Sequence, residues 1–443
     1  MQDKLMNEGS EKSQTAEHEY CEQLLYLDDN KDALTWRIRL IKMARKELIL
    51  STFDFIGDSS GLNIISALLN AQTRGVHIMI LMDGMNGYRR LSSCSAFWYL
   101  ASLDNVEVRY YNPIRKLPIY KINYRLHEKY LIADDKAYLL GGRNIDDVSL
   151  ASRSEGTNID RDILVSGTDI SCSGSCSTPP SLKAVKQYFN KIWNLPFCSD
   201  VNDKCEFDPE NEKSRLEMIF DDLNSRPEME ISGAMFENMI PASEIRLLYN
   251  SWDVRRKPPV LWDLMHCQML QGRDIIIQTP YIICNNKMYT DLEEICSSET
   301  NIRILTNSPE TGANVFGCSD YLNERNRILK TGVELYEYSG VYSLHTKTVL
   351  IDDDLSIVGS FNMDMRSAYF DTELMLLIKS PDLNAELRKT FQSFVDSCLH
   401  LYPDGKKAKG CNYVYRPMGK RKKTVYSGIR VMCKAARPAR KFL

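Results

Sequence analysis

LHEKYLIADDKAYLLGGRN, residues 126–144, indicates a duplicated fold, because its pattern of side chains returns in LHTKTVLIDDDLSIVGSFN, residues 344–362. Both segments have the spacing H-x-K-x4-D-x6-G-G/S-x-N. The repeated residues are His127, Lys129, Asp134, Gly142 and Asn144 in the first copy, and His345, Lys347, Asp352, Ser360 and Asn362 in the second. A single copy arises by accident in some long chains, but two aligned copies indicate an internal repeat.

The segments around the two copies also repeat, in the same order and at an offset of about 220 residues. Apolar runs at 47–56, 77–83 and 106–111 are matched in the second half by runs at 274–283, 301–307 and 333–338. A run such as VHIMILM is apolar throughout, as expected for a strand that helices cover on both faces. The alternation of strands and helical patterns predicts an α/β fold of two pseudo-symmetric halves. We expect each half to be a mainly parallel sheet flanked by helices, with a single active site between the halves.

Composition divides the chain further. We expect a flexible N-terminus at 1–22, a first half at 23–205, a charged linker at 206–241, a second half at 242–402 and a basic tail at 403–443. Residues 405–443 contain 13 Lys and Arg and no Asp or Glu, which leaves 43 basic and 59 acidic residues in the rest of the chain. An acidic body with a basic tail predicts that the tail contacts an anionic partner.

The cysteines and the first residues limit the class of protein. The 13 cysteines include no pair spaced as zinc ligands with histidine partners, so we expect free thiols and neither a metal nor a cofactor. The N-terminal segment MQDKLMNEGSEKSQTAEHEY lacks the basic and apolar regions of a signal peptide, and no apolar run approaches the roughly 20 residues that span a bilayer. We therefore expect a cytoplasmic protein.

Each copy of the motif combines groups that suit a phosphate. In a strand, alternate residues face the same side, so His127 and Lys129 project together, as do His345 and Lys347. An imidazole acts as nucleophile or general acid and base near neutral pH, and a lysine stabilises an anionic oxygen. The asparagines add amide donors, at Asn144 and Asn362, and the residues Gly142 and Ser360 are expected to let the backbone or a hydroxyl approach the phosphate. Asp134 and Asp352 complete the motif and are expected to fix its turn rather than to transfer protons.

Two copies complete a reaction. If the halves pack about a pseudo-twofold axis, two histidines, two lysines and two asparagines surround one phosphoryl group. One histidine then attacks phosphorus and forms a phosphohistidine, while the other protonates the leaving oxygen. Charge on the phosphoryl oxygens is held by lysines and amides, so we expect the chemistry to be independent of metal.

The doubled motif resembles the signature of the phospholipase D superfamily, over about residues 24–401. The segments YLDDNKDALTWRIRLIKMARKELILSTF, GGRNIDD, ILTNSPETGANVFGCSDYLNERNRILKTGVELYEY and GSFNMDMRS resemble bacterial cardiolipin synthases, in particular the soluble C type. The resemblance implies transfer of a phosphatidyl group through a phosphohistidine to an alcohol such as phosphatidylglycerol. Residues 147–158, DVSLASRSEGTN, depart from the family, which has an aromatic, glycine-containing stretch there, so the acceptor pocket is expected to differ.

The resemblance also assigns roles to residues outside the motif. It implies that an acidic residue after each copy orients the histidine, and Asp162 and Glu373 occupy those places; the alternative is that they are ordinary acids at strand edges. It implies His127 as the nucleophile and His345 as the acid and base. Arg143 and Arg366 flank the two copies. They either bind a second phosphate or pair with Asp146 and Asp364, and we favour the pairing.

Alternatives remain for the tail and for the reaction. In the tail, residues 424–436 have the pattern of an amphipathic helix, which we interpret as a helix lying on an anionic membrane. A solvated tail and nucleic-acid binding are the other interpretations, and nucleic acid is not expected because the body is acidic. The leading function is a phosphatidyltransferase acting on phospholipid, peripheral on the cytoplasmic face of the membrane. The alternatives are a phosphodiesterase of the same fold, which hydrolyses phospholipid or nucleic acid, and a binding protein that has lost catalysis.

Overall fold

The computed structural model describes residues 22–113, 121–154, 156–167, 178–201, 205–408, 413 and 418–436. The expected flexible N-terminus, the cysteine-containing loop around residue 174 and the last residues of the basic tail lie outside these ranges. No helix among the described residues is long and apolar enough to cross a membrane.

The first half is built on one sheet. Among the described residues its strand order is β10-β1-β8-β6-β5-β2-β3-β4-β9. The strands are β1 (Glu22–Leu27), β2 (Glu47–Thr52), β3 (His77–Asp83), β4 (Val106–Tyr111), β5 (Tyr130–Ala133), β6 (Ala137–Gly141), β8 (Asp162–Ser166), β9 (Cys198–Asp200) and β10 (Ile240–Ala242). The helices of this half are α2 (Asn30–Met43), α3 (Ser59–Thr73), α4 (Asn86–Leu91), α5 (Ser95–Ala101), α6 (Asp147–Leu150), α7 (Pro180–Trp193) and α8 (Pro209–Asn224).

The second half repeats this arrangement, with the strand order β11-β18-β17-β16-β12-β13-β14-β19. The strands are β11 (Glu244–Tyr249), β12 (Asp274–Gln278), β13 (Asn301–Asn307), β14 (Glu334–Tyr338), β16 (Thr348–Ile351), β17 (Leu355–Gly359), β18 (Leu374–Lys379) and β19 (Cys398–Leu401). The helices are α9 (Val260–Met269), α10 (Asn286–Ser297), α11 (Val315–Lys330), α12 (Met365–Tyr369), α13 (Pro381–Val395) and α14 (Lys420–Ala436). The matching order of strands confirms the duplicated α/β architecture predicted from the sequence.

The sheets differ from the expectation in one respect, because they are mixed rather than mainly parallel. Within the two large sheets, only β2-β3-β4 and β12-β13-β14 pair in parallel among the described strands. Each motif copy forms a hairpin of two antiparallel strands, β5-β6 in the first half and β16-β17 in the second. Strand β5 also pairs antiparallel with β2, and β16 pairs antiparallel with β12. A connection of a few residues allows only antiparallel neighbours, and a parallel pair requires a long crossover.

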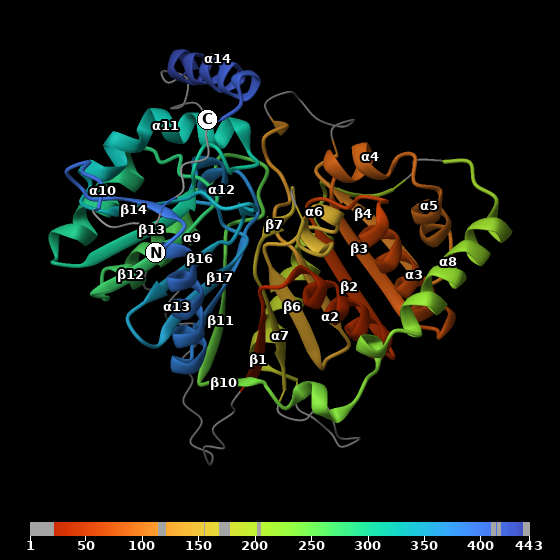
Figure 1. Ribbon diagram of the computed structural model, residues 1–443. Coiled ribbons are helices and arrows are strands. Elements are labelled where there is room, and N and C mark those ends of the chain that lie inside the picture. Colours follow the sequence, from red (N-terminus) through yellow and green to blue (C-terminus); the bar gives the residue numbers. More distant parts are fainter. Residues whose placement is uncertain are drawn as a thin grey trace.

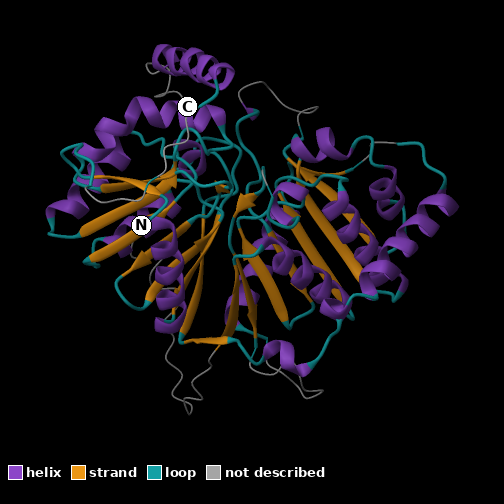
Figure 2. Ribbon diagram, viewed as in Figure 1, coloured by secondary structure: helices purple, strands orange, loops and turns teal. Residues whose placement is uncertain are grey.

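The two sheets lie next to each other in the middle of the molecule, with helices on their outer faces (Figures 1 and 2). Strand β3 shows how the sequence produces this layering, since its alternate side chains enter different cores. Ile78 and Ile80 pack with α2 and α3 on the outer side. Leu81 packs in a central core that also contains Leu305 and Leu350 of the second half. The apolar strands therefore hold the halves together and fix the ends of the motif hairpins against each other.

The segment expected to be a linker, 206–241, contains helix α8, which packs on the first half. Leu216, Phe220 and Leu223 are buried in the outer core of that half. Their spacing places them on one helical stripe, but charged residues on the other faces conceal it in the sequence. Strand β10 joins the first sheet and β11 joins the second, so the chain crosses between the sheets at Ser243.

The described part of the basic tail is helix α14, which begins at Lys420 and packs against α11. Tyr426 anchors it, with its ring only 1% exposed. Arg430 and Asn323 exchange hydrogen bonds, since the Asn323 amide donates to the Arg430 carbonyl and the Arg430 Nε donates to Asn323 Oδ1. The tail helix is thus fixed at the top of the second half (Figure 1).

Candidate active site

The two histidines lie where the halves meet. His127 lies three residues before the start of β5, and His345 lies between the short strand β15 (Ser343–Leu344) and β16. The backbone N–H of His127 donates to the Thr372 carbonyl of the second half at 3.2 Å. The N–H of His345 donates to the Ile159 carbonyl of the first half at 2.7 Å, beside the parallel pairing of β15 with β7 (Asn158–Ile159). Each histidine is therefore held by the opposite half.

Both histidines line one cavity of about 470 Å³ between the halves. Its walls combine both motif asparagines with charged and aromatic side chains from the two halves: Phe53, Asp54, Arg90, Asn144, Tyr281, Asn362, Asp364, Arg366 and Asp371. The Oδ1 atoms of Asn144 and Asn362 are buried and have no hydrogen-bond partner among the described residues. Unpaired buried polar atoms are rare in folded proteins, so these two acceptor oxygens are available to a ligand that donates a hydrogen bond.

A carboxylate from the opposite half holds each imidazole. His127 Nδ1 lies 2.9 Å from Glu373 Oε1, and His345 Nδ1 lies 2.5 Å from Asp160 Oδ2. Because a partner on Nδ1 fixes the ring and its tautomer, Nε2 is the nitrogen of each histidine that remains for a ligand. The crossed pairing makes the two motif copies interdependent, since neither histidine is oriented without the other half.

Asp160, and not Asp162, is the partner of His345, which corrects the sequence prediction. Asp162 is fully buried and accepts from Arg37 and Arg143, at 3.0 and 3.1 Å. The backbone shows the true equivalence, because Gly142 N–H donates to the Arg161 carbonyl and Ser360 N–H donates to the Leu374 carbonyl. Asp160 thus corresponds to Glu373. The sequence offers both aspartates of D-R-D, and only the pairing between strands distinguishes them.

The two positions expected to contact phosphate, Gly142 and Ser360, instead support the orienting carboxylates. A Cβ on Gly142 would lie 2.3 Å from Asp160 Oδ1, so glycine leaves the space that this carboxylate occupies. The Ser360 hydroxyl donates to Glu373 Oε2, and its side chain is fully buried. The second half therefore uses the longer side chain of Glu373 with a serine beside it, and the first half uses the shorter Asp160 with a glycine beside it.

The motif aspartates lie at the far ends of β5 and β16, away from the cavity. Asp134 and Asp352 have positive φ values of 54° and 47°, which turn residues such as Asp tolerate. The Asp134 carboxylate accepts from the backbone N–H groups of residues 45–47, and Asp352 accepts from residues 273 and 274. They join the hairpin to the start of the central strand and are not part of the reacting set.

The motif lysines fold back on their own histidines. Lys129 Nζ donates to the His127 carbonyl, and Lys347 Nζ donates to the His345 carbonyl and lies 3.5 Å from Asp160 Oδ2. Burial lowers the pKa of both lysines, that of Lys129 to about 7. An anionic phosphate in the cavity would restore their charge, because a nearby negative charge favours the protonated amine.

Burial also shapes the titration of the histidine pairs. It lowers the pKa of His127 well below its usual value, with Lys129 contributing in the same direction, and it lowers the pKa of His345. Burial raises the pKa of Glu373 to about 7. The pKa of Asp160 is raised by burial but lowered more by the charges of Lys347 and His345, so this carboxylate stays ionised at neutral pH. The two pairs are therefore electrostatically different although their geometry is similar.

The flanking arginines both pair with aspartates, as expected from the sequence. Their partners are not the expected Asp146 and Asp364. Arg143 is buried and donates to Asp162, and Arg366 Nε lies 3.1 Å from Asp371 Oδ2. Arg366 is half exposed and lines the cavity. Asp371 is also near His127 and Glu373, and the ligand atoms of these three residues lie close enough together to hold a cation. Such an ion would compete for the Nδ1 atom that the carboxylate of Glu373 already occupies.

Glu128 lies between His127 and Lys129 in sequence but is buried away from the cavity, where it accepts hydrogen bonds from Tyr188 and Ser51. Burial raises its pKa from 4.5 to about 7. A carboxyl group whose pKa is higher in the folded than in the unfolded state stabilises the fold fully at pH values below its unfolded pKa. This stabilisation is lost as the pH rises through its folded pKa.

We expect Glu128→Gln to remove this pH dependence. Urea unfolding at pH 5 and pH 8 should show the variant gaining up to about 3 kcal/mol relative to wild type at the higher pH. An equal stability difference at both pH values would contradict a neutral buried Glu128.

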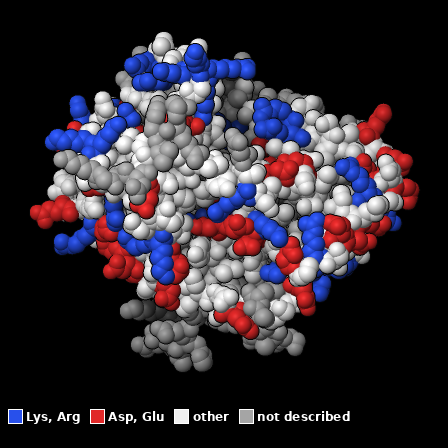
Figure 3. Space-filling model, viewed as in Figure 1, with Lys and Arg blue, Asp and Glu red and all other residues white. Residues whose placement is uncertain are grey.

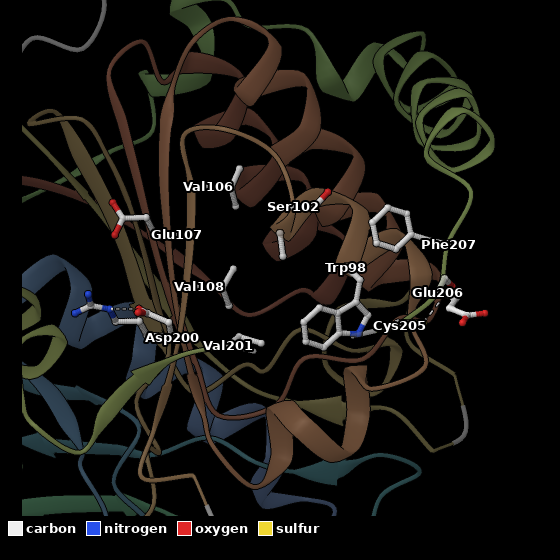
Figure 4. A pocket seen from close by; sticks show the side chains of 12 residues that line it. Trp98, Ser102, Val106, Glu107, Val108, Asp200, Val201, Cys205, Glu206 and Phe207 are labelled. Atoms are coloured by element: carbon white, nitrogen blue, oxygen red, sulfur yellow. Dashed lines mark hydrogen bonds and ion pairs between the residues drawn. The ribbon is translucent and has the colours of Figure 1, made fainter. Parts of the chain in front are cut away.

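A larger hollow of about 670 Å³ lies at the outer edge of the first sheet, between β4, β9 and α5 (Figure 4). Trp98, Val106, Val108 and Phe207 line it. None of the described residues around it belongs to either motif, so its size does not make it the reaction site.

Comparison with known proteins agrees with this geometry. Two similar α/β halves, each contributing one motif histidine to the same cavity, agree with the phospholipase D-like fold that the comparisons indicate. The family model described as "Cardiolipin synthase, PLD-like domain" matches residues 38–193 and 265–395. The chain belongs to this family of the phospholipase D superfamily.

Individual relatives share about a quarter of their residues or fewer with this chain. The chain is 27% identical to cardiolipin synthase C of Escherichia coli K12 over 434 residues, covering 86% of each protein. It is also 27% identical over 410 residues to an uncharacterized protein of Helicobacter pylori 26695, covering 85% of this chain and 80% of that one. Among solved structures, phosphatidylserine synthase of Haemophilus influenzae Rd KW20 superposes with a TM-score of 0.65 at 16% identity, covering 95% of this chain and 96% of that one. At that identity the likeness shows the fold alone.

Proposed function

We propose that the protein is a phosphatidyltransferase of the cardiolipin synthase type, which moves a phosphatidyl group through a phosphohistidine to an alcohol such as phosphatidylglycerol. One observation carries the proposal: the histidines of both repeats line one cavity, and each is oriented by a carboxylate of the opposite half. The family match and the cardiolipin synthase relatives support phosphatidyl transfer at the level of the family.

The proposed first step uses His127 as nucleophile. Its Nε2 attacks the phosphorus of the donor lipid, a P–N bond forms, and the P–O bond to the head-group alcohol breaks. His345 donates its proton to the leaving oxygen. The lowered pKa of His127 keeps its imidazole neutral for attack. Burial and the charge of Lys347 lower the pKa of His345, and the ionised Asp160 acts against both by stabilising the protonated imidazole that this step needs.

The second step returns the enzyme to its starting state. The acceptor hydroxyl gives its proton to His345 and attacks phosphorus, so that a new P–O bond forms and the P–N bond to His127 breaks. Lys129, Lys347 and the amides of Asn144 and Asn362 stabilise the charge on the phosphoryl oxygens. Water in place of the alcohol would yield phosphatidic acid by the same chemistry.

Purified protein incubated with phosphatidylglycerol vesicles tests the proposed function. We expect cardiolipin and free glycerol to form in equal amounts. Lipid mass spectrometry measures the cardiolipin, and an enzymatic assay measures the glycerol. Phosphatidic acid with glycerol and no cardiolipin would assign the protein to the hydrolases, and unchanged lipid would remove the proposed function. His127→Asn protein serves as the control for contaminating activity.

We further propose that α14 places the protein on the cytoplasmic face of an anionic membrane. Lys and Arg side chains gather over this helix in Figure 3, and its exposed basic residues are Lys420, Arg421, Lys423 and Lys434. Val431 and Met432 expose 68% and 51% of their surface beside them. Basic side chains next to exposed apolar ones are typical of a helix that lies in a lipid interface.

Replacing those four basic residues with Gln should weaken binding to anionic vesicles. Each basic residue near such a surface contributes on the order of 1 kcal/mol, so we expect a loss of roughly 100-fold or more at low salt. A vesicle sedimentation assay across salt concentrations measures it, because the wild-type affinity should fall steeply with salt. The control exchanges four exposed lysines of the first half, Lys46, Lys136, Lys183 and Lys213. Equal losses in both variants would show a general charge effect and contradict a role for α14.

A further inference from the structure

The two halves differ at one wall of the cavity. After β2, the Thr52 hydroxyl donates to the carbonyl of Asp54 at 2.9 Å, and after β12 the Thr279 hydroxyl donates to the carbonyl of Tyr281 at 3.1 Å. Asp54 and Tyr281 are therefore equivalent positions, and both line the cavity. The first half places a carboxylate where the second half has an aromatic ring. A symmetric phosphate site does not require this carboxylate.

One carboxylate oxygen of Asp54, Oδ1, is buried at the cavity wall and makes an ion pair but no hydrogen bond among the described residues. The residue as a whole is 8% exposed. Arg90 of α4 lies beside it, with Nε 3.5 Å from this Oδ1, and the arginine side chain is 41% exposed. An ionised carboxylate only accepts hydrogen bonds, so it binds a group that donates one, such as a hydroxyl or an amine. An exposed guanidinium binds phosphate.

We propose that Asp54 and Arg90 form the subsite for the acceptor alcohol, in which Asp54 accepts a hydrogen bond from an acceptor hydroxyl and Arg90 binds a phosphate on the same molecule. The inference rests on the proposed transferase function and names its acceptor class, a polyol that carries its own phosphate. The donor phosphate belongs between the histidines and lysines, because a carboxylate repels it. Lys and Arg side chains also gather over α4, at the mouth between the halves (Figure 3), where a second anionic group would enter.

The test measures how the enzyme divides the phosphatidyl group between water and a soluble acceptor. Phosphatidylglycerol in mixed micelles serves as donor, and labelled glycerol or glycerol 3-phosphate serves as acceptor. The readout is the ratio of labelled transfer product to phosphatidic acid, which does not depend on the fraction of folded enzyme. The variants are Asp54→Asn and Arg90→Gln. The matched controls are Asp253→Asn and Arg255→Gln, an exposed ion pair at 3.1 Å that is not among the residues lining the cavity.

We expect Asp54→Asn to lower this ratio at least about 10-fold for both acceptors, a change that corresponds to about 1.4 kcal/mol. Arg90→Gln should lower the ratio for glycerol 3-phosphate at least about 10-fold more than the ratio for glycerol. The control variants should keep the wild-type ratios. Wild-type ratios in both cavity variants would overturn the inference, as would an equal loss of transfer and hydrolysis. A wild-type enzyme that forms neither product would instead refute the proposed function, so the two failures are distinguishable.

Discussion

His127→Asn and His345→Asn should each abolish nearly all turnover, with losses of at least about 10⁴-fold for the nucleophile and about 10²–10⁴-fold for the acid and base. The reason is the shared cavity, since one histidine forms the bond to phosphorus and the other moves the proton. Residues that act as one unit are not additive, so the double variant should be no slower than His127→Asn alone. Initial rates on phosphatidylglycerol vesicles measure all three proteins.

The control for this prediction is His77→Asn. His77 is partly exposed, pairs with Glu107 and lies at the start of β3, so its loss should leave the rate unchanged. Two independent sites, one in each half, would give a different pattern. Each single variant would then keep about half of the activity and only the double variant would lose it, which would contradict the shared site.

Asp160→Asn and Asp162→Asn should separate catalysis from stability, although the residues are two positions apart. Asp160→Asn removes the carboxylate that orients His345 and stabilises its protonated form, so kcat should fall about 10²–10⁴-fold. Asp162→Asn leaves Arg37 and Arg143 facing a neutral amide in the core. Breaking such a buried pair costs about 3–5 kcal/mol, so we expect a large fall in the free energy of unfolding and a normal kcat for the folded protein.

Urea unfolding and initial rates on both proteins check this pair of predictions. Glu373→Gln is the matching variant for His127 and should resemble Asp160→Asn. An inactive Asp162→Asn protein with wild-type stability, together with an active Asp160→Asn protein, would contradict this assignment. Asp162 would then be the acid that orients His345.

The sequence predicted the parts of the site that lie close together in the chain. His127 and Lys129 stand two residues apart, and their copy in the second half repeats the whole pattern, so the shared cavity followed from the duplication. Of the two acids expected to orient a histidine, Glu373 lies 2.9 Å from His127 Nδ1, whereas the acid beside His345 is Asp160, two residues before the expected Asp162. The pairing of β7 with β15 decides which aspartate reaches His345. That pairing joins segments from different halves, and no local pattern records it.

Other parts were hidden for equally physical reasons. The parallel sheets were overpredicted because apolar strands buried on both faces have the same composition in mixed and in parallel sheets. Helix α8 was missed because three apolar residues on one stripe, Leu216, Phe220 and Leu223, are diluted by charges on the exposed faces. Asp54 and Arg90 lie outside the motif, and only the folded cavity places them beside His127.

The most direct test of the account is to find the covalent intermediate. Wild-type and His345→Asn proteins would be mixed with phosphatidylglycerol, quenched in denaturant at high pH, where phosphohistidine survives, and digested for peptide mass spectrometry. We expect a phosphatidyl adduct on the peptide that contains His127, and none in His127→Asn protein. An adduct on His345 in the wild-type protein would contradict the assignment of the two histidines, and active enzyme without any adduct would contradict the phosphohistidine itself.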